Sequence, residues 1–331
     1  MKLARSVELR PWRVQLEIDA GDRLLALRQS DRCILIVSLR SAAAAVGFLI
    51  MATGICGAVE PMGAERTAAT FNLGDMQITS LLDATDSINN DGKVFGISVG
   101  PQAVAKVLQQ AGVPTDKIAL SINVLLVRSA GRVMLFDTGF GPGSHGALQQ
   151  RLAALGVLPS DVTDIFITHA HHDHTGGLTA EQGQLAFPNA QIHIAEREWA
   201  SMQSRQTYKA LVDLISPRVE TFEWGTEVIP GVLSVSLPGH TPAHTGFELQ
   251  SEGRELIDVG DIVHSSIISL AEPSWPMGFD ENKTQAIETR TSELRRLAES
   301  QELVFAPHFP FPGVGRIEFA GDGFCWQPAK F

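Results

Sequence analysis

The segment FITHAHHDHTGGL, residues 166–178, constrains this chain more than any other. It holds four histidines and one aspartate within six positions, directly after a short run of β-prone residues. At the end of an extended run, His169 and His171 point to the same side, and Asp173 and His174 follow as the chain turns. Imidazole and carboxylate groups are ligands for a divalent ion such as zinc, with manganese, cobalt, iron or nickel as alternatives. The segment therefore predicts a metal site at the end of a strand.

Three further segments carry a histidine or an aspartate where an apolar run ends beside glycine or proline. They are SLPGHTPAHTG, LIDVGDIVH and FAPHFPFPG, which contain His240, Asp261 and His308. Strands that finish at one edge of a sheet bring such ends together from distant parts of a sequence. This recurrence disfavours a solvated loop with incidental histidines. We expect one site assembled from several segments.

Composition excludes one large class of partners. The chain has 331 residues, 44% of them hydrophobic, which is enough to bury a full core. Its formal net charge is −11, whereas a nucleic-acid-binding surface usually needs clustered Lys and Arg to replace counterions. We therefore expect a small-molecule substrate and no nucleic-acid partner.

Residues 1–60 are expected to form an N-terminal extension with a segment typical of a secretory signal. Arg40 precedes an uncharged apolar run over residues 42–58. A permanent membrane span needs about 20 residues, so this run is barely long enough. We expect export to the periplasm or the medium, with only transient membrane contact through the leader. A lasting anchor formed by the same run is the alternative.

From about Thr70 onward, short apolar runs alternate with turns and helical stretches, which is typical of an α/β domain. No linker rich in proline, glycine or serine splits this region, so we expect one domain over residues 70–331. The turn Ala130-Gly131 predicts a hairpin between two of the strands. Helices are predicted over residues 98–114, 146–156, 196–216 and 282–300.

The chain resembles the metallo-β-lactamase fold superfamily, whose signature H-x-H-x-D-H matches residues 169–174 and is followed here by Thr-Gly-Gly. Within that superfamily it looks most like the methyl parathion hydrolase branch. The motifs that carry this likeness are, in order, FDTGFG, THAHHDHTGGL, LAFPNA, PGHTPAHT, VGDIV and PHFPFPGVG. The resemblance implies a four-layer αββα sandwich with the metals at one edge between two β-sheets.

The resemblance also implies a ligand set for two divalent metal ions per chain, with zinc as the expected metal. One ion would be held by His169, His171 and His240, the other by Asp173, His174 and His308, with Asp261 bridging both. Sites that leave a position open for water are catalytic rather than structural. Two such ions share a hydroxide that attacks an ester-like bond: a phosphotriester, a lactone or a carboxylic ester. Asp173 and Asp261 are the expected catalytic carboxylates, with Asp173 also available to carry a proton.

Other residues are assigned supporting roles. His172 is expected to point away from its neighbours. Three residues are expected near the metals without binding them directly: Asp137, His244 and His264. Because catalytic pockets are lined mainly by apolar groups, four aromatic residues are candidates for a substrate wall: Trp199, Trp275, Phe309 and Phe311.

Two other functions are compatible with the same ligands. One is an iron-dependent redox enzyme on the same fold, and the other is a non-catalytic metal-binding protein. The superfamily resemblance further implies that β-lactam hydrolysis is not favoured, because Asp261 stands where true metallo-β-lactamases commonly carry Cys or another residue. The resemblance also implies a possible homodimer, because homodimers are common in the family.

Overall fold

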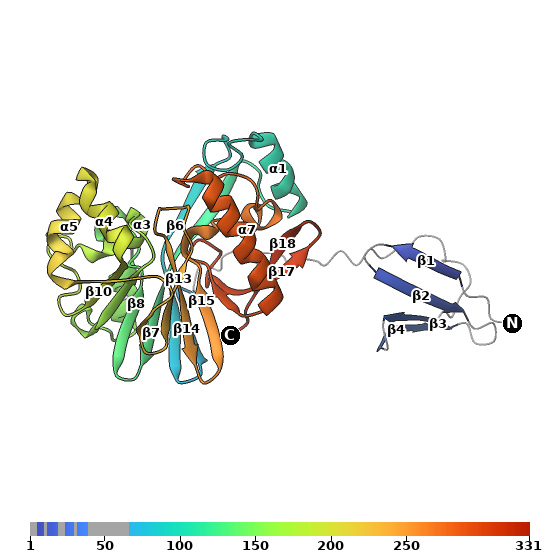
Figure 1. Ribbon diagram of the computed structural model, residues 1–331, viewed down its shortest axis with the longest axis horizontal. Coiled ribbons are helices and arrows are strands. Elements are labelled where there is room, and N and C mark those ends of the chain that lie inside the picture. The colour runs from blue at the N-terminus through green and yellow to red at the C-terminus, as the bar shows by residue number, and fades with distance from the viewer. Residues whose placement is uncertain (1–4, 10–11, 19–23, 30–31, 39–65) are drawn as a thin grey trace. The chain divides into compact units, whose positions relative to one another are not determined.

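A computed structural model of the chain describes residues 5–9, 12–18, 24–29, 32–38 and 66–331 (Figure 1). The chain divides into two compact units, Met1–Thr53 and Gly54–Phe331. The described part of the first unit is an antiparallel sheet in the order β1-β2-β3-β4, which we did not predict. Its strands are β1 (Arg5–Leu9), β2 (Trp12–Ile18), β3 (Leu24–Gln29) and β4 (Arg32–Ser38).

The signal-like run over residues 42–58 lies outside the described residues, so its role stays a prediction. Among the residues that the structure describes, no helix combines the length and the apolar character needed to cross a membrane.

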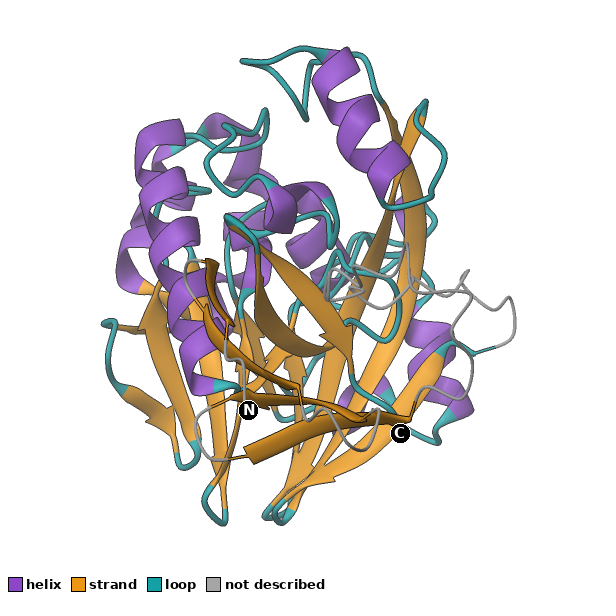
Figure 2. Cartoon of the chain, turned by 90° about the vertical axis from the view of Figure 1, so that its right-hand side faces the viewer, coloured by secondary structure: helices purple, strands orange, loops and turns teal. Residues whose placement is uncertain are grey.

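Two seven-stranded mixed sheets form the body of the second unit (Figure 2). The first sheet has the order β11-β10-β9-β8-β7-β6-β5. Its strands are β5 (Ala68–Leu73), β6 (Met76–Asn89), β7 (Lys117–Ser129), β8 (Arg132–Phe136), β9 (Asp164–Ile167), β10 (Gln191–Ala195) and β11 (Val219–Phe222). The second sheet runs β12 to β18 in chain order. Its strands are β12 (Glu227–Ile229), β13 (Val232–Ser236), β14 (Thr245–Ser251), β15 (Arg254–Asp258), β16 (Leu303–Phe305), β17 (Val314–Ala320) and β18 (Gly323–Pro328).

Helices form the two outer layers. Figure 1 shows α4 and α5 beside the sheet that holds β8 and β10, and α7 beside β17 and β18. The α-helices are α1 (Pro101–Gln110), α2 (Leu148–Ala154), α3 (His172–Thr175), α4 (Glu196–Ser204), α5 (Lys209–Ile215), α6 (Ile268–Ala271) and α7 (Lys283–Ser300). The predicted four-layer αββα sandwich is confirmed.

Strand β9 shows why the layers form. Ile165 and Ile167 belong to the outer core that also contains Leu152 of α2. Phe166 lies between them and points the other way, with its ring 5.4 Å from that of Phe247 in β14 of the second sheet. Because side chains alternate along a strand, a strand such as β9 that is buried at every position must be covered on both faces. The helix layer covers one face and the opposite sheet covers the other.

The predicted hairpin at Ala130-Gly131 joins β7 to β8 and is confirmed. The single helix predicted over 196–216 is wrong, because α4 and α5 are separated at Arg205, whose backbone is extended. The guanidinium of Arg205 donates to both carboxylate oxygens of Glu281, at 2.6 and 2.7 Å. This tertiary ion pair accompanies the break, and helical periodicity alone does not reveal it.

Strand directions place the site. In the second sheet, β13 and β15 are both antiparallel to β14, and β16 is parallel to β15, so all three end at the same edge. In the first sheet, β8 and β9 are parallel and also end together. A backbone hydrogen bond from Thr245 N to Thr168 O, 2.9 Å long, links the two sheets near these ends. The segments after all five strands therefore meet at one edge of the sandwich.

We predict that Phe247→Ala destabilises the second unit. The side chain is fully buried between the sheets, and truncation of such a ring costs about 3–5 kcal/mol through lost contacts and a residual cavity. Urea unfolding followed by tryptophan fluorescence measures the loss. Phe319→Ala is the control, because that ring is 56% exposed. Equal effects of the two changes would contradict packing of the sheets through Phe247.

Candidate metal centre

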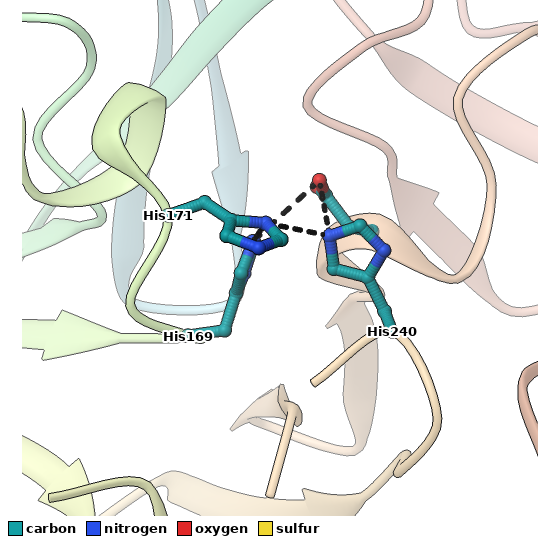
Figure 3. A group of neighbouring side chains, drawn as sticks. His169, His171 and His240 are labelled. Carbon is teal, nitrogen blue, oxygen red and sulfur yellow. Dashed lines mark hydrogen bonds and ion pairs between the residues drawn. The ribbon is translucent and has the colours of Figure 1, made fainter. Parts of the chain in front are cut away.

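The first half of the site gathers three histidines and a carboxylate. Figure 3 shows the rings of His169 and His171, which follow β9, converging with that of His240, which follows β13. The Nδ1 atom of His171 lies 3.0 Å from Nε2 of His169 and 2.9 Å from Nε2 of His240. Oδ2 of Asp261, just after β15, lies 3.6 Å from His169 Nε2 and 3.3 Å from His240 Nε2. Four ligand atoms thus face one point.

The second half uses the other oxygen of the same aspartate. Oδ1 of Asp261 lies 3.2 Å from His174 Nε2 and 3.1 Å from His308 Nε2, and His308 Nε2 is also 3.2 Å from Oδ2. Oδ2 of Asp173 completes this group at 3.6 Å from His174 Nε2 and 3.5 Å from His308 Nε2. The structure therefore brings together all seven residues that the resemblance proposed as ligands, and Asp261 lies between the two groups.

These distances and the hydrogen bonding both suit metal ions. A tetrahedral site with Zn–N bonds of about 2.0–2.1 Å separates its ligand atoms by roughly 3.3 Å, which lies within the range of the distances above. His174 Nε2 and Asp261 Oδ1 are buried and have no hydrogen-bond partner in the described part of the chain. A buried polar atom without a partner is costly, and a cation bound between them would remove that cost.

Asp137, after β8, orients the ring of His174. It has a left-handed backbone, with φ of 60°, a conformation that residues other than glycine rarely adopt. Its carboxylate accepts hydrogen bonds from Thr168 N at 2.9 Å, from Thr168 Oγ1 at 2.8 Å and from His174 Nδ1 at 2.7 Å. Because Nδ1 is held in this way, Nε2 of His174 is directed into the site.

A buried ion pair supports His240 from behind. Nδ1 of His240 lies 3.1 Å from Oδ1 of Asp280, and Oδ2 of Asp280 lies 3.4 Å from the guanidinium of Arg290 in α7. Arg290 also donates to the backbone carbonyls of Pro273, Ile262 and Trp275. The guanidinium therefore connects the support of His240 to the segment that carries Asp261.

Other contacts hold Asp261 and His308 in place. The backbone N–H of Asp261 donates to His244 Nε2 at 2.8 Å, and His244 Nδ1 donates to Leu237 O at 3.0 Å. His308 Nδ1 donates to Ser121 O at 3.0 Å. The buried amide of Asn123 donates to the carbonyls on either side of His308, those of Pro307 and Phe309. His244 is thus a support for the aspartate rather than a member of either ligand group.

Burial disfavours the charged form of the histidines and aspartates in the site, and neighbouring side chains determine whether each pKa rises or falls. Burial lowers the pKa of His171 to about 4, and the adjacent His240 adds to this effect. For His240, hydrogen bonds with Asp261 and Asp280 outweigh burial and raise the pKa to about 9. Burial also opposes ionisation of Asp261, but His174 and His308 hold the pKa of its carboxyl well below the usual range. A metal ion must displace the proton from His240, so binding would release protons.

The remaining predicted residues are placed as follows. His264 is buried beside the site, with Nε2 3.1 Å from Asp261 Oδ2 and its ring stacked on His308. The exposed His172 points elsewhere, toward Ser144 Oγ at 3.0 Å. Among the aromatic candidates, Phe309 is fully buried in a core cluster, and Phe311 is half-buried. Trp199 and Trp275 are half-buried against two other clusters.

Sequence reasoning missed an aromatic residue that does lie beside the site. Phe279 is 41% exposed, and its ring centroid is 5.6 Å from that of His264. No metal-ligand motif surrounds it, and a single phenylalanine before an aspartate carries no signal of its own. Phe279 lies beside the site because the segment before α7 packs near the strand ends.

Comparison with known proteins decides the family. The family model described as Metallo-beta-lactamase superfamily matches residues 118–308. The chain belongs to this superfamily. The matched range includes β9, the histidine-rich segment after it and all the other proposed ligands.

Individual proteins resemble the chain over shares of its length that range from one third to four fifths. AidC, described as a dizinc quorum-quenching lactonase, is 26% identical with a TM-score of 0.76, covering 80% of this chain and 98% of AidC. The hydrolase AbOPH is 29% identical with a TM-score of 0.73 and the same coverage. Mycobacterium bovis has a protein named Probable metallo-hydrolase Mb2322c that is 28% identical, covering 58% of this chain and 76% of that protein. An N-acyl homoserine lactonase of Bacillus cereus is 32% identical, covering 32% of this chain and 40% of the lactonase.

We predict that Asp261→Ala lowers the number of metal ions bound per chain. One carboxylate faces both ligand groups, so its removal takes an acceptor from each of them. Metal content after dialysis against zinc, measured by mass spectrometry, checks this. His172→Ala serves as the control, since that ring belongs to the same segment but points away from the ligands. An unchanged metal count in Asp261→Ala would refute a shared ligand.

Proposed function

We propose that this protein is a dinuclear metal-dependent hydrolase that opens lactones or related carboxylic esters. The observation that carries the proposal is the convergence of two ligand groups on the one carboxylate of Asp261. The likeness to AidC and to Bacillus N-acyl homoserine lactonases favours a lactone as substrate. The metal is proposed to be zinc, which suits ligand groups made of imidazoles and carboxylates.

The proposal assigns each ligand group one divalent cation. His169, His171 and His240 would hold one, Asp173, His174 and His308 the other, and Asp261 both. When bound, a pair of such ions would supply a hydroxide at neutral pH and polarise the carbonyl or phosphoryl oxygen of the substrate. The negative charge of Asp261 offsets the repulsion between two dications.

Residues of the chain itself provide the proton transfer and the orientation of the substrate. The side chain of Asp173 is 25% exposed, whereas that of Asp261, the other carboxylate of the two groups, is 3% exposed. It is therefore the carboxylate best placed to pass a proton to a leaving group. The ring of His264 lies beside the proposed metal position, with Nε2 3.1 Å from Asp261 Oδ2, and the exposed ring of Phe279 lies next to it.

A phosphotriester substrate is the second candidate. It is supported by the six motifs that resemble the methyl parathion hydrolase branch. The two candidates share the metal centre and differ in the group that must fit beside it. Hydrolysis of both substrate classes would be compatible with the same ligands.

Metal dependence and substrate class are tested together. We expect the purified protein to bind about two zinc ions and to hydrolyse N-acyl homoserine lactones faster than aryl esters or paraoxon-like phosphotriesters. Chelation should abolish turnover, and added zinc should restore it. Bound iron with oxygen uptake would instead indicate a redox enzyme. Two bound ions without turnover of any substrate would indicate a metal-binding protein.

The exposed ring of Phe279 leads to a prediction about specificity. The ring provides an apolar surface next to His264, which lies against the ligand His308. Burying part of such a ring against an acyl chain contributes roughly 1–2 kcal/mol, so Phe279→Ala should raise KM about 5–30-fold for long-chain lactones. Short-chain lactones should be affected little. Phe319→Ala, another exposed phenylalanine, is the control, and equal chain-length profiles for both variants would exclude Phe279 from the substrate site.

A further inference from the structure

The side chain of Glu198 is a buried carboxylate outside both ligand groups. It lies in the first turn of α4 and is 2% exposed. Within the described part of the chain it forms no ion pair, although burial of an unpaired carboxylate is costly. Three hydrogen bonds compensate for this cost, and all of them come from the segments that carry metal ligands. A carboxylate kept in such a place needs a function other than solubility.

Each oxygen of Glu198 serves a different segment. Oε1 accepts a hydrogen bond of 3.0 Å from the backbone N–H of Ala170, the residue between His169 and His171. Oε2 accepts one of 2.9 Å from Thr241 Oγ1, next to His240, and one of 3.3 Å from Ala243 N. One rigid carboxylate thus spans the segment after β9 in the first sheet and the segment after β13 in the second.

We infer that Glu198 is a positioning residue that sets the separation between the His169–His171 segment and His240, and thereby preforms one metal site. The inference rests on the proposed metal centre. The 2.9 Å approach of His171 Nδ1 to His240 Nε2 brings together rings from the two segments that Glu198 ties to each other. None of the residues that bond to Glu198 is adjacent in sequence to a member of the second group. Asp173 and His174 lie in α3, after His171, and His308 belongs to another segment. The effect of Glu198 should therefore fall on the first group.

A purely structural role has a different signature. An acidic residue in the first turn of a helix stabilises that helix through its dipole wherever the side chain points. Glu196 lies in the same turn of α4 and is exposed, so it shares that contribution without reaching the ligand segments. Glu196→Gln is therefore a matched control for Glu198→Gln. Both variants lose one charge at the same helix end, and only one of them loses an acceptor to Ala170 or Thr241.

The test is stepwise titration of the metal-free full-length protein with Co²⁺ against a competing chelator, with the visible absorption of the bound Co²⁺ recorded. We expect Glu198→Gln to weaken one binding step about 10–100-fold, the range for residues that orient metal ligands, and to change the absorption of that step. Glu196→Gln should match the unchanged protein in both readouts. Thr241→Val, which removes one of the three donors, should give a smaller weakening of the same step and guards against misfolding of the first variant.

The outcomes separate this inference from the proposed function. Wild-type affinity and absorption in Glu198→Gln would overturn the inference. So would equal weakening by Glu196→Gln, which would indicate an effect of helix charge. If the unchanged protein binds metal but hydrolyses no ester, the proposed function fails, and the titration still judges Glu198. If it binds no Co²⁺ at all, both proposals fail.

Discussion

The carboxylate of Asp261 is surrounded by five imidazole rings, and the rest of the site is arranged around it. His169, His174, His240, His264 and His308 all place a ring nitrogen within 3.6 Å of one of its oxygens. Such an arrangement cannot be stable in a dry interior unless charge is balanced among its members. Cations bound between the rings and the carboxylate provide that balance, which is why the geometry is best explained as a metal centre.

Holding these rings in place requires a second set of buried polar groups. Asp137 fixes one ring nitrogen of His174, Asp280 fixes one of His240, and His244 holds the backbone of Asp261. Every one of these contacts leaves the other nitrogen, or the carboxylate, free to face the centre. The strands that precede these residues end at one edge of the sandwich. Backbone hydrogen bonds between the two sheets, such as that from Thr245 N to Thr168 O, hold the strand ends together there.

Much of this could be predicted from the sequence. His169 and Asp261 stand in motifs at strand ends, and the alternation of apolar runs with helices indicates an α/β domain. The four-layer sandwich and the full set of proposed ligands came from the resemblance to the superfamily. The supporting groups could not be predicted in the same way. Glu198, Asp280 and Asn123 are ordinary polar residues in their local sequence, and only long-range packing shows what they bind. The N-terminal strands and the break between α4 and α5 were missed as well, the latter because helical periodicity does not reveal the extended backbone of Arg205 or its ion pair with Glu281.

Arg290 couples the metal centre to the surface that a substrate would meet. Its guanidinium pairs with Asp280 behind His240, and it also donates to the carbonyls of Pro273 and Trp275 in the segment that leads to Phe279. The ring beside the centre and the support of one ligand thus depend on the same buried cation. A change in the segment before α7 that displaces Arg290 would move His240 as well as the ring of Phe279. Substrate range and metal affinity are therefore expected to change together at this position, whereas Asp137 and Asn123 support the other ligand group through contacts of their own, with His174 and with the carbonyls beside His308.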